Sequence, residues 1–341
     1  MPTIEILNPL GVRGWDRLVL EFPGCTIFHS AAWARVLAES YGYAPQYITL
    51  KKGGRLLAVL PVMEIQSFLT GRRGVSLPFS DLCPPLVQDP SFLEPLIEAA
   101  ISHGKIRRWK HLDLRGANLP SRPFCSYYGH HLDLAPGERK LFSGLKSSHK
   151  RNIKKAENEG VAVSFFRSLE SVRSFSRLNG MTRKKHGLPP QPFRFFRKLH
   201  EHLISKGKGI VALAAHRGKT VAGAVYLNFG KTAVYKYGAS DPAWLHLRPN
   251  NLVMWESIRR YARKGFDLLD FGRTDLDHDG LLRFKRGWGG EETILHYHRF
   301  DMATSRFVES ETGPKNSHTL MKKMPEPVLR GIGMMLYRHM G

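Results

Sequence analysis

Apolar and polar residues along the second half of the chain follow two kinds of pattern. Short runs rich in β-branched and other apolar residues predict strands, and apolar residues three or four apart predict helices. In chain order we expect a helix at 145–160, a strand at 161–166, helices at 169–186 and 192–205, strands at 209–215, 220–228 and 232–237, a helix from Asn250 or Asn251 to Lys264, a strand at 267–271 and a short helix at 281–288. This order indicates a mixed α/β unit.

The first half shows a shorter version of the same order. Ser30 is expected to cap a helix that ends at Gly42, because a Ser hydroxyl can accept from a first-turn amide and glycine tolerates a left-handed end. Two β-rich runs around Gly53-Gly54 predict a hairpin with a two-residue turn. We therefore predict two similar α/β domains in tandem, at 1–140 and 141–300.

The remaining residues, 301–341, are predicted to be a tail with a Ser- and Thr-rich loop and a final helix at 327–339. Apolar residues on one face of that helix indicate that it docks on the body of the protein, and we place it on the N-terminal domain. An amphipathic helix of this kind can instead lie on a membrane surface.

The stretch from Leu268 to Gly290 combines a buried strand, a polar loop and a short helix. Phe284 and Trp288 lie four residues apart and share a helix face, and Lys285 points to the side of that face. Arg273 leaves the strand near the point where α/β folds bind ligands. Spacing alone also fits an aromatic core face beside solvated bases, with Arg273 paired to a nearby Asp.

Composition narrows the class of protein. The chain has 341 residues, 42% of them hydrophobic, and no run of 18 apolar residues or basic apolar leader, so we expect a globular cytoplasmic protein. Three scattered cysteines form neither a disulfide framework nor a zinc pattern. The net charge of +23 attracts phosphate-bearing partners, but its spread along the chain argues against a dedicated DNA site.

The predicted helix 145–160 concentrates some of this charge. Six bases or potential bases fall within ten residues: Lys146, His149, Lys150, Arg151, Lys154 and Lys155. They fit either a phosphate or RNA surface or a solvated helix face, since no aromatic residue is interleaved for base stacking.

With this order of elements established, the chain resembles the GNAT acyltransferase fold, and more narrowly the FemABX superfamily of tandem GNAT-like domains. The motifs that carry the resemblance are Asp270-Phe-Gly-Arg-Thr274, Phe284-Lys-Arg-Gly-Trp-Gly289, Ser30-Ala-Ala-Trp-Ala-Arg-Val36, Ile153-Lys-Lys-Ala-Glu157 and Lys185-His-Gly-Leu188. The first two are especially similar to FemAB-like proteins encoded with exopolysaccharide synthesis genes. The resemblance implies that both domains are mostly antiparallel twisted sheets flanked by helices.

The resemblance also implies roles for individual residues. Lys285 and Phe284 match the family's Phe-Lys pair at the acceptor and aminoacyl site. Arg35 stands where related enzymes have a Lys that holds acceptor phosphate, and Tyr237 matches a tyrosine lining the cleft. Gln191 stands where enzymes acting on a nucleotide-linked muropeptide have Arg, and a neutral amide in that place argues against assuming that acceptor.

GNAT-type transfer requires a neutral amine next to an ester or thioester carbonyl and a donor for the developing oxyanion, without a covalent enzyme intermediate. Asp275 and Asp277 are candidates for the general base, and substrate or water is an equal alternative. The turn before the predicted helix is expected to contact the donor; its candidate residues are Arg248, Asn250 and Asn251. It lacks Gly-x-Gly and contains Pro249, so the usual CoA cradle is doubtful and aminoacyl-tRNA stays an option.

The loop with Asp275, Asp277, His278 and Asp279 is a weak candidate for a cation site, and we predict no metal and no tightly bound cofactor. The function that fits best is an N-acyltransferase for an amine on a cell-envelope polysaccharide or peptidoglycan precursor, with acyl-CoA or aminoacyl-tRNA as co-substrate. Its acceptor is expected to be a phosphate-bearing small molecule or lipid-linked, with peripheral contact to the inner membrane as a further option. The alternative is a non-catalytic basic adaptor that binds tRNA or an anionic membrane surface.

Overall fold

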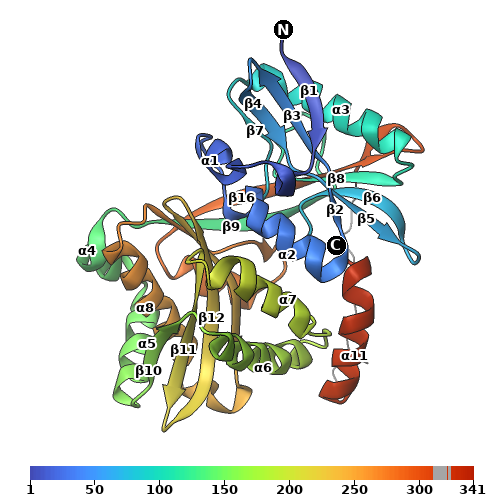
Figure 1. The fold of residues 1–341 in the computed structure, drawn as a ribbon. Helices are drawn as coiled ribbons and strands as arrows, with labels where there is room; N and C mark the ends of the chain where they lie inside the picture. The colour runs from blue at the N-terminus through green and yellow to red at the C-terminus, as the bar shows by residue number, and fades with distance from the viewer. Residues whose placement is uncertain (310–320, 322–323) are drawn as a thin grey trace. The chain divides into compact units, whose positions relative to one another are not determined.

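The computed structural model describes residues 1–309, 321 and 324–341 (Figure 1). The rest of the predicted tail loop lies outside the described residues. The described chain is a mixed α/β protein whose sheets are mostly antiparallel, which confirms the predicted fold class. It divides into two compact units: Met1–Tyr127 with Leu336–Gly341 and the described part of Ile294–Lys315, and Tyr128–Thr293 with the described part of Asn316–Met335.

The described residues of the first unit contribute to two sheets and form three α-helices. One sheet has the strand order β1-β3-β4-β7, and the other contains β16-β8-β6-β5-β2. The strands are β1 (Thr3–Leu7), β2 (Ala44–Pro45), β3 (Tyr47–Lys52), β4 (Arg55–Leu60), β5 (Met63–Ser67), β6 (Gly71–Ser76), β7 (Leu86–Val87), β8 (His111–Arg115) and β16 (Glu291–Asp301), with β17 (Arg306–Val308) paired to β16. The helices are α1 (Trp15–Leu20), α2 (Ala31–Tyr41) and α3 (Leu93–Ile106).

The predicted helix cap and the predicted hairpin turn of this unit are confirmed. The Ser30 side chain accepts from the amide of Trp33 at the start of α2, and Gly42 ends the helix in the left-handed region. Gly53 and Gly54 both have positive φ and form the turn of the β3–β4 hairpin. Helix α3 packs on β3, β4 and β8 over a core that contains Leu96, Trp109 and Leu112.

The second unit is built around the strand order β10-β11-β12-β13-β14-β9. Its strands are β10 (Ala162–Phe166), β11 (Gly209–His216), β12 (Lys219–Phe229), β13 (Thr232–Ser240), β14 (Leu268–Asp270), β9 (Cys125–Asp133) and the short β15 (Thr274–Asp275). Its helices are α4 (Gly137–Gly144), α5 (Ser147–Asn158), α6 (Leu169–Lys185), α7 (Phe193–Leu199), α8 (Pro249–Arg263), α9 (Asp279–Arg286) and α11 (Glu326–Leu336), the last residue of which groups with the first unit.

Helices cover both faces of this sheet. Alternate residues of β11, among them Ile210, Ala212 and Ala214, join the core under α8. On the opposite face, Gly223 of β12 lies against Leu213 and against Phe175 of α6. A side chain at position 223 would collide with Leu213. The buried sheet positions therefore alternate as pleated strands require.

Two predicted boundaries differ from the structure. The chain passes from the first unit to the second within β9 and returns within β16, so the division falls at 127/128 and 293/294 instead of at 140 and 300. The expected helix 145–160 is confirmed as α5 (Ser147–Asn158), and the extended Leu145 and Lys146 separate it from a further helix, α4, at Gly137–Gly144. The sequence pattern did not predict α4.

The final helix also differs from the prediction. Residues up to Met335 group with the second unit, where the main chain of Pro190 lies against Gly333. Only Leu336–Gly341 groups with the first unit, where the Tyr43 hydroxyl donates to the carbonyl of Tyr337 at 3.0 Å. The expected docking on the N-terminal domain therefore holds for Leu336–Gly341 and not for the described residues up to Met335. Among the described residues, no helix has the length and apolar character needed to cross a membrane.

Candidate functional site

The sheet of the second unit opens where β13 and β14 separate. The two strands pair in parallel from Thr232↔Leu268 to Val234↔Asp270. Beyond this point β13 continues to Ser240 beside β12, whereas β14 ends. The Asp270 carboxylate accepts from the amide of Gly272 at 2.7 Å, and Gly272 takes a positive φ of 66°, so the chain turns away from the sheet. The open end of a parallel strand pair is a usual position for a ligand site.

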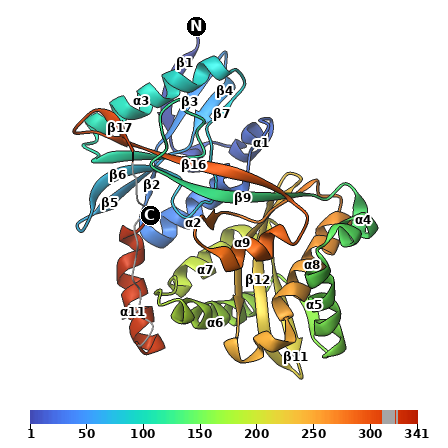
Figure 2. The same cartoon turned by 180° about the vertical axis from the view of Figure 1, so that it is seen from behind.

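Lys285 holds the loop that follows this turn. It lies on α9, which is labelled in Figure 2 and which begins where the His278 ring accepts from the amide of Leu281. The Lys285 Nζ donates to the main-chain oxygens of Gly272 at 2.7 Å and Arg273 at 3.0 Å, and only 2% of the residue is exposed. A buried ammonium needs such partners. In this structure the Lys285 side chain holds the loop backbone through these two hydrogen bonds and is not exposed on the surface of a cleft.

Phe284 is half-buried and belongs to an aromatic cluster. Its ring lies 5.6 Å from the ring of Trp288, and His149 of α5 lies 5.6 Å from Phe284 and 4.6 Å from Trp288 between centroids. The predicted contact of Phe284 with Trp288 is confirmed, although the helix ends at Arg286 and Trp288 lies just beyond it. His149 is only 6% exposed, so it is not one of the solvated bases that the sequence pattern suggested. Its apolar neighbours explain the difference.

The His149 ring also binds the backbone of α9. Its Nε2 donates to the carbonyl of Phe284 at 2.9 Å, which fixes the neutral tautomer because a carbonyl can only accept. Burial lowers the pKa of His149, and the nearby charge of Lys146 acts in the same direction. The close approach requires glycine at 287, since an added Cβ would lie 2.3 Å from the ring.

A second buried histidine, His130 on β9, begins a charged network. Its Nε2 lies 2.9 Å from a carboxylate oxygen of Glu292, which also accepts two bonds from Arg286 at 2.6 and 2.7 Å. Burial lowers the pKa of His130, as does the charge of Lys285. The hydrogen bonds from Arg286 lower the pKa of Glu292. His130 Nδ1 is buried and has no hydrogen-bond partner among the described residues.

Sequence spacing gave no signal for His130 or Glu292, and it singled out His149 only as a potential surface base. His130 and Glu292 are 162 positions apart, and only the pairing of the strands brings them together. Their roles depend on burial and on side-chain direction, neither of which is encoded in a local motif.

The predicted donor-contact residues lie at the start of α8. Arg248, not Asn, occupies the N-cap position, with a left-handed φ of 58° and an exposed side chain, and Pro249 is the first helical residue. Proline suits this position because its missing N–H would have no helical partner. Asn250 donates to the Ser240 hydroxyl at 3.2 Å. Asn251 is buried, and its Nδ2 has no hydrogen-bond partner among the described residues.

The other predicted site residues lie in different surroundings. Tyr237 is half-buried on β13 with its ring 5.7 Å from Phe196 of α7, and Lys236 lies over its face at 5.3 Å. Arg273 and Gln191 are half-buried in loops. Arg35 is exposed on α2 of the first unit.

The structure brings Lys285 to the backbone of Arg273 and Asn250 to the end of the strand that carries Tyr237. The loop acids Asp275, Asp277 and Asp279 are exposed, and the nearby His278 is used as a helix cap.

A groove of about 940 Å³ runs between α4, α5 and α8. Bases outnumber acids along it: Arg139, Lys150, Arg151, Lys154 and Arg259 line it together with Glu138 and Glu157. Glu138 is already bound to Arg259 at 2.7 Å. Phe142 and Trp255 form its apolar floor, with ring centroids 5.0 Å apart. The groove therefore combines an unbalanced positive charge with aromatic surface.

Comparison with known proteins identifies the class of this fold. Residues 143–286 match the family model of the acetyltransferase (GNAT) domain. FemX has a similar structure, with a TM-score of 0.67 and 14% identity over 86% of this chain and 96% of FemX. A tandem GNAT protein from the clavulanic acid biosynthesis pathway gives a TM-score of 0.56 and 12% identity over 93% of this chain and all of that protein. Residues 143–286 thus match a GNAT domain, and the chain has a fold similar to that of tandem GNAT proteins.

A local sequence match is more specific. Over 79 residues the chain is 37% identical to the Lipid II:glycine glycyltransferase of Staphylococcus saprophyticus subsp. saprophyticus. The match covers 21% of this chain and about a fifth, 19%, of that relative's length. Together with the FemX-like fold, it confirms the resemblance to FemABX-like tandem GNAT proteins.

Proposed function

We propose that this protein is an N-acyltransferase that moves an acyl or aminoacyl group onto an amine of a cell-envelope sugar or peptidoglycan precursor. The observation that carries the proposal is the opening between β13 and β14 in a GNAT domain, with the adjacent loop held by Lys285. The local similarity to a glycyltransferase that acts on Lipid II supports an envelope acceptor.

The reaction needs few protein groups. A neutral amine attacks the carbonyl of the donor, a C–N bond forms, and the C–O or C–S bond to the carrier breaks. The amine loses a proton, and the departing oxygen or sulfur takes one up. Backbone N–H groups and fixed positive charge stabilise the transient oxyanion most when they are already in place. Lys285 contributes by fixing the Gly272-Arg273 backbone, and in this proposal the Arg273 guanidinium binds an acidic part of a substrate.

The donor is an acyl-CoA or an aminoacyl-tRNA in this proposal. Pro249 removes one N–H from the start of α8, and the amide of Asn251 is engaged with the carbonyl of Arg248 at 3.1 Å, so few amides are left for a pyrophosphate. The basic groove along α5 supports a larger polyanionic donor such as charged tRNA.

Mass spectrometry of the reaction products tests the proposal. The protein is incubated with an envelope-precursor extract and either a set of acyl-CoA thioesters or a pool of charged tRNAs. We expect a precursor whose mass rises by one acyl or aminoacyl residue with one of the two donor pools. Unchanged precursors with both pools, under conditions in which the protein is folded, would contradict the proposal.

A non-catalytic adaptor is the second candidate, because Lys146 at the start of α5 and Arg151, Lys154 and Lys155 on it are exposed. An adaptor would bind tRNA with an affinity that falls steeply with salt but would transfer nothing. Binding of uncharged tRNA without any turnover of charged tRNA would favour this candidate.

A further inference from the structure

The turn between β5 and β6 exposes two large apolar side chains. Phe68 is 85% exposed and Leu69 is 55% exposed. The hairpin projects outward from the first unit (Figures 1 and 2), so its tip is accessible. Single exposed apolar residues are ordinary, but two at a projecting tip form a small apolar patch that can be buried in an apolar environment outside the protein.

This tip is held rigidly in place. The Ser67 hydroxyl accepts from the amides of Leu69 at 3.2 Å and Thr70 at 3.0 Å, which closes the turn. Ser67 also contacts the His339 ring at 2.9 Å, and that ring packs edge-on against Phe68 with centroids 4.5 Å apart. The Phe68 side chain is therefore exposed to solvent on a turn that these contacts hold in place.

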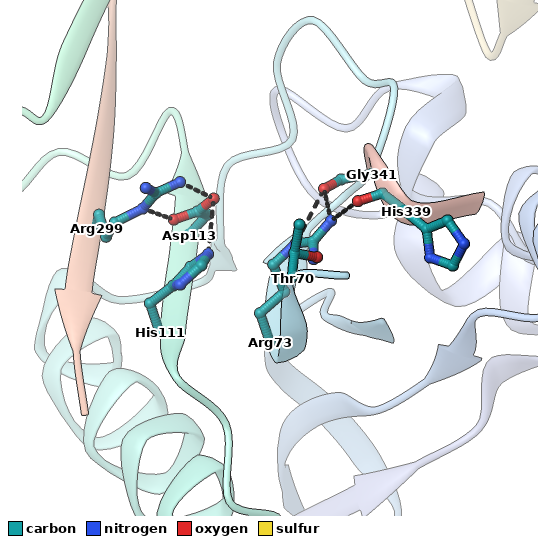
Figure 3. A network of polar contacts seen from close by, with 7 residues as sticks. All are labelled: Thr70, Arg73, His111, Asp113, Arg299, His339 and Gly341. Atoms are coloured by element: carbon teal, nitrogen blue, oxygen red, sulfur yellow. Dashed lines mark hydrogen bonds and ion pairs between the residues drawn. The ribbon is translucent and has the colours of Figure 1, made fainter. Parts of the chain in front are cut away.

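Arg73 ties the last residues of the chain to the same hairpin. Figure 3 shows its guanidinium directed at the main-chain oxygens of His339 and Gly341, at 2.7 and 2.9 Å. It also donates to the Thr70 hydroxyl. This anchoring brings Met340, which is 55% exposed, into the neighbourhood of the tip as a third apolar side chain.

Positive charges lie directly behind the tip. Arg72 is exposed, and its carbonyl accepts from the amide of Lys110 at 2.8 Å. The Lys110 stem covers Gly71, where an added Cβ would lie 2.4 Å from its Cε, so the ammonium lies beside the turn. Arg338 is exposed next to His339 on the tail.

The nearby acid does not offset these charges. Glu64, at the base of the hairpin, is 1% exposed and is bound by Arg107 and Trp109.

We propose that Phe68, Leu69 and Met340 insert into an anionic phospholipid surface while Arg72, Lys110 and Arg338 contact its headgroups. An apolar tip followed by a ring of bases matches the order of acyl chains and anionic headgroups across a bilayer interface. Three side chains are too small a patch for a stable protein interface, which buries about 800 Å² on each partner. The inference does not depend on the proposed transferase activity.

Vesicle sedimentation of the full chain tests this surface. The probes are phosphatidylcholine vesicles with and without phosphatidylglycerol, at low and high salt. We expect the protein to sediment with the anionic vesicles and to be released by salt. The Phe68→Ser, Leu69→Ser double variant should partition at least about tenfold more weakly, since it removes two apolar anchors. Neutralising Arg72 or Lys110 with Gln should each weaken binding about fivefold.

Ile4→Ser is the matched control, because Ile4 is an apolar residue of the same unit, 41% exposed on β1. It should bind like the unchanged protein, and thermal melting should show that every variant is folded. The inference is overturned if the unchanged protein does not bind anionic vesicles, or if the double variant binds them equally well. It is also overturned if the double variant alters self-association and leaves vesicle binding as it was.

Discussion

The His149 ring donates its Nε2 proton to the main-chain carbonyl of Phe284 at 2.9 Å, and so links α5 to the helix that carries Lys285. The bond is made one residue before the lysine whose ammonium clamps Gly272 and Arg273. His149 therefore helps to fix the position of Lys285 through the backbone of α9. A small shift of α9 would therefore move Lys285 and the loop that borders the opening of the sheet.

Substitution of His149 should separate this positioning role from simple packing. His149→Phe keeps an aromatic ring between Phe284 and Trp288 but removes the donor, and we expect kcat to fall about tenfold with a smaller change in KM. His149→Gln retains a donor near the Nε2 position and should recover part of the loss. Steady-state kinetics with the donor and acceptor found by mass spectrometry provide the measurement. Equal kcat in both variants would show that the hydrogen bond has no functional role.

Lys285 gives a second prediction. Lys285→Met keeps most of the side-chain volume but leaves two buried carbonyls without their donor, so we expect a loss of about 2 kcal/mol in the free energy of unfolding. Transfer activity should fall by about a hundredfold, because the loop backbone is no longer fixed. Denaturant unfolding and product formation measure the two effects. Arg283→Met on the same helix is the control, since Arg283 is exposed, and unchanged activity in Lys285→Met would contradict the assigned role.

His29 in the first unit should make stability depend on pH. Its Nε2 donates to the carbonyl of Pro84 at 2.9 Å, and its Nδ1 accepts from the amide of Thr26 at 3.0 Å. Burial lowers the pKa of His29 to about 4, against an ordinary value of 6.5. The unfolded chain therefore binds a proton below pH 6.5 that the folded chain does not take up until about pH 4, and stability falls as pH decreases through this window.

Denaturant titrations at pH 7 and pH 4 measure this effect. The contribution of His29 to the decrease should be about 3 kcal/mol. His29→Asn retains an acceptor for the Thr26 amide and does not titrate, so its stability should change less between the two pH values. The same pH dependence in both proteins would contradict the assignment.

Glu64 produces the opposite type of pKa shift. Burial alone would raise its pKa, but hydrogen bonds from Arg107, Gln66 and Trp109 lower it to about 2. The stability that ionised Glu64 contributes to the folded protein is fully present above pH 4.5, the ordinary pKa of the carboxyl group. It is lost as pH falls toward 2, because the unfolded chain is protonated first. Glu64→Gln should cost about 3 kcal/mol of unfolding free energy at pH 7 and much less near pH 2. Denaturant melts at the two pH values check the difference, and Gln66→Ala is a control that removes only one of the donors.

The sequence pattern predicted those features of the fold that depend on neighbours along the chain. Ser30 caps its helix, Gly53-Gly54 turns the hairpin, and the ring of Phe284 contacts that of Trp288. The cap of α8 was mistaken because Asn is the commoner cap, whereas Pro249 fixes the first helical residue and places Arg248 before it.

Features that depend on distant residues were not predictable in this way. The motif drew attention to Lys285 but could not show that its ammonium is bound by two carbonyls. His149 was counted as a surface base because only polar neighbours adjoin it along the chain, while the aromatic rings that bury it are more than 130 positions away. The His130–Glu292 contact likewise depends on strand pairing.

The position of β16 has a consequence for how the protein is made. Residues Tyr297–Asp301 pair with His111–Arg115, so a strand of the first unit follows residues 128–293 of the second unit in the chain. During synthesis, residues 128–293 can emerge from the ribosome while β8 still lacks this neighbour. The unit that begins the chain therefore lacks one of its strands until those residues have been made, and until then the open edge of β8 is exposed to mispairing.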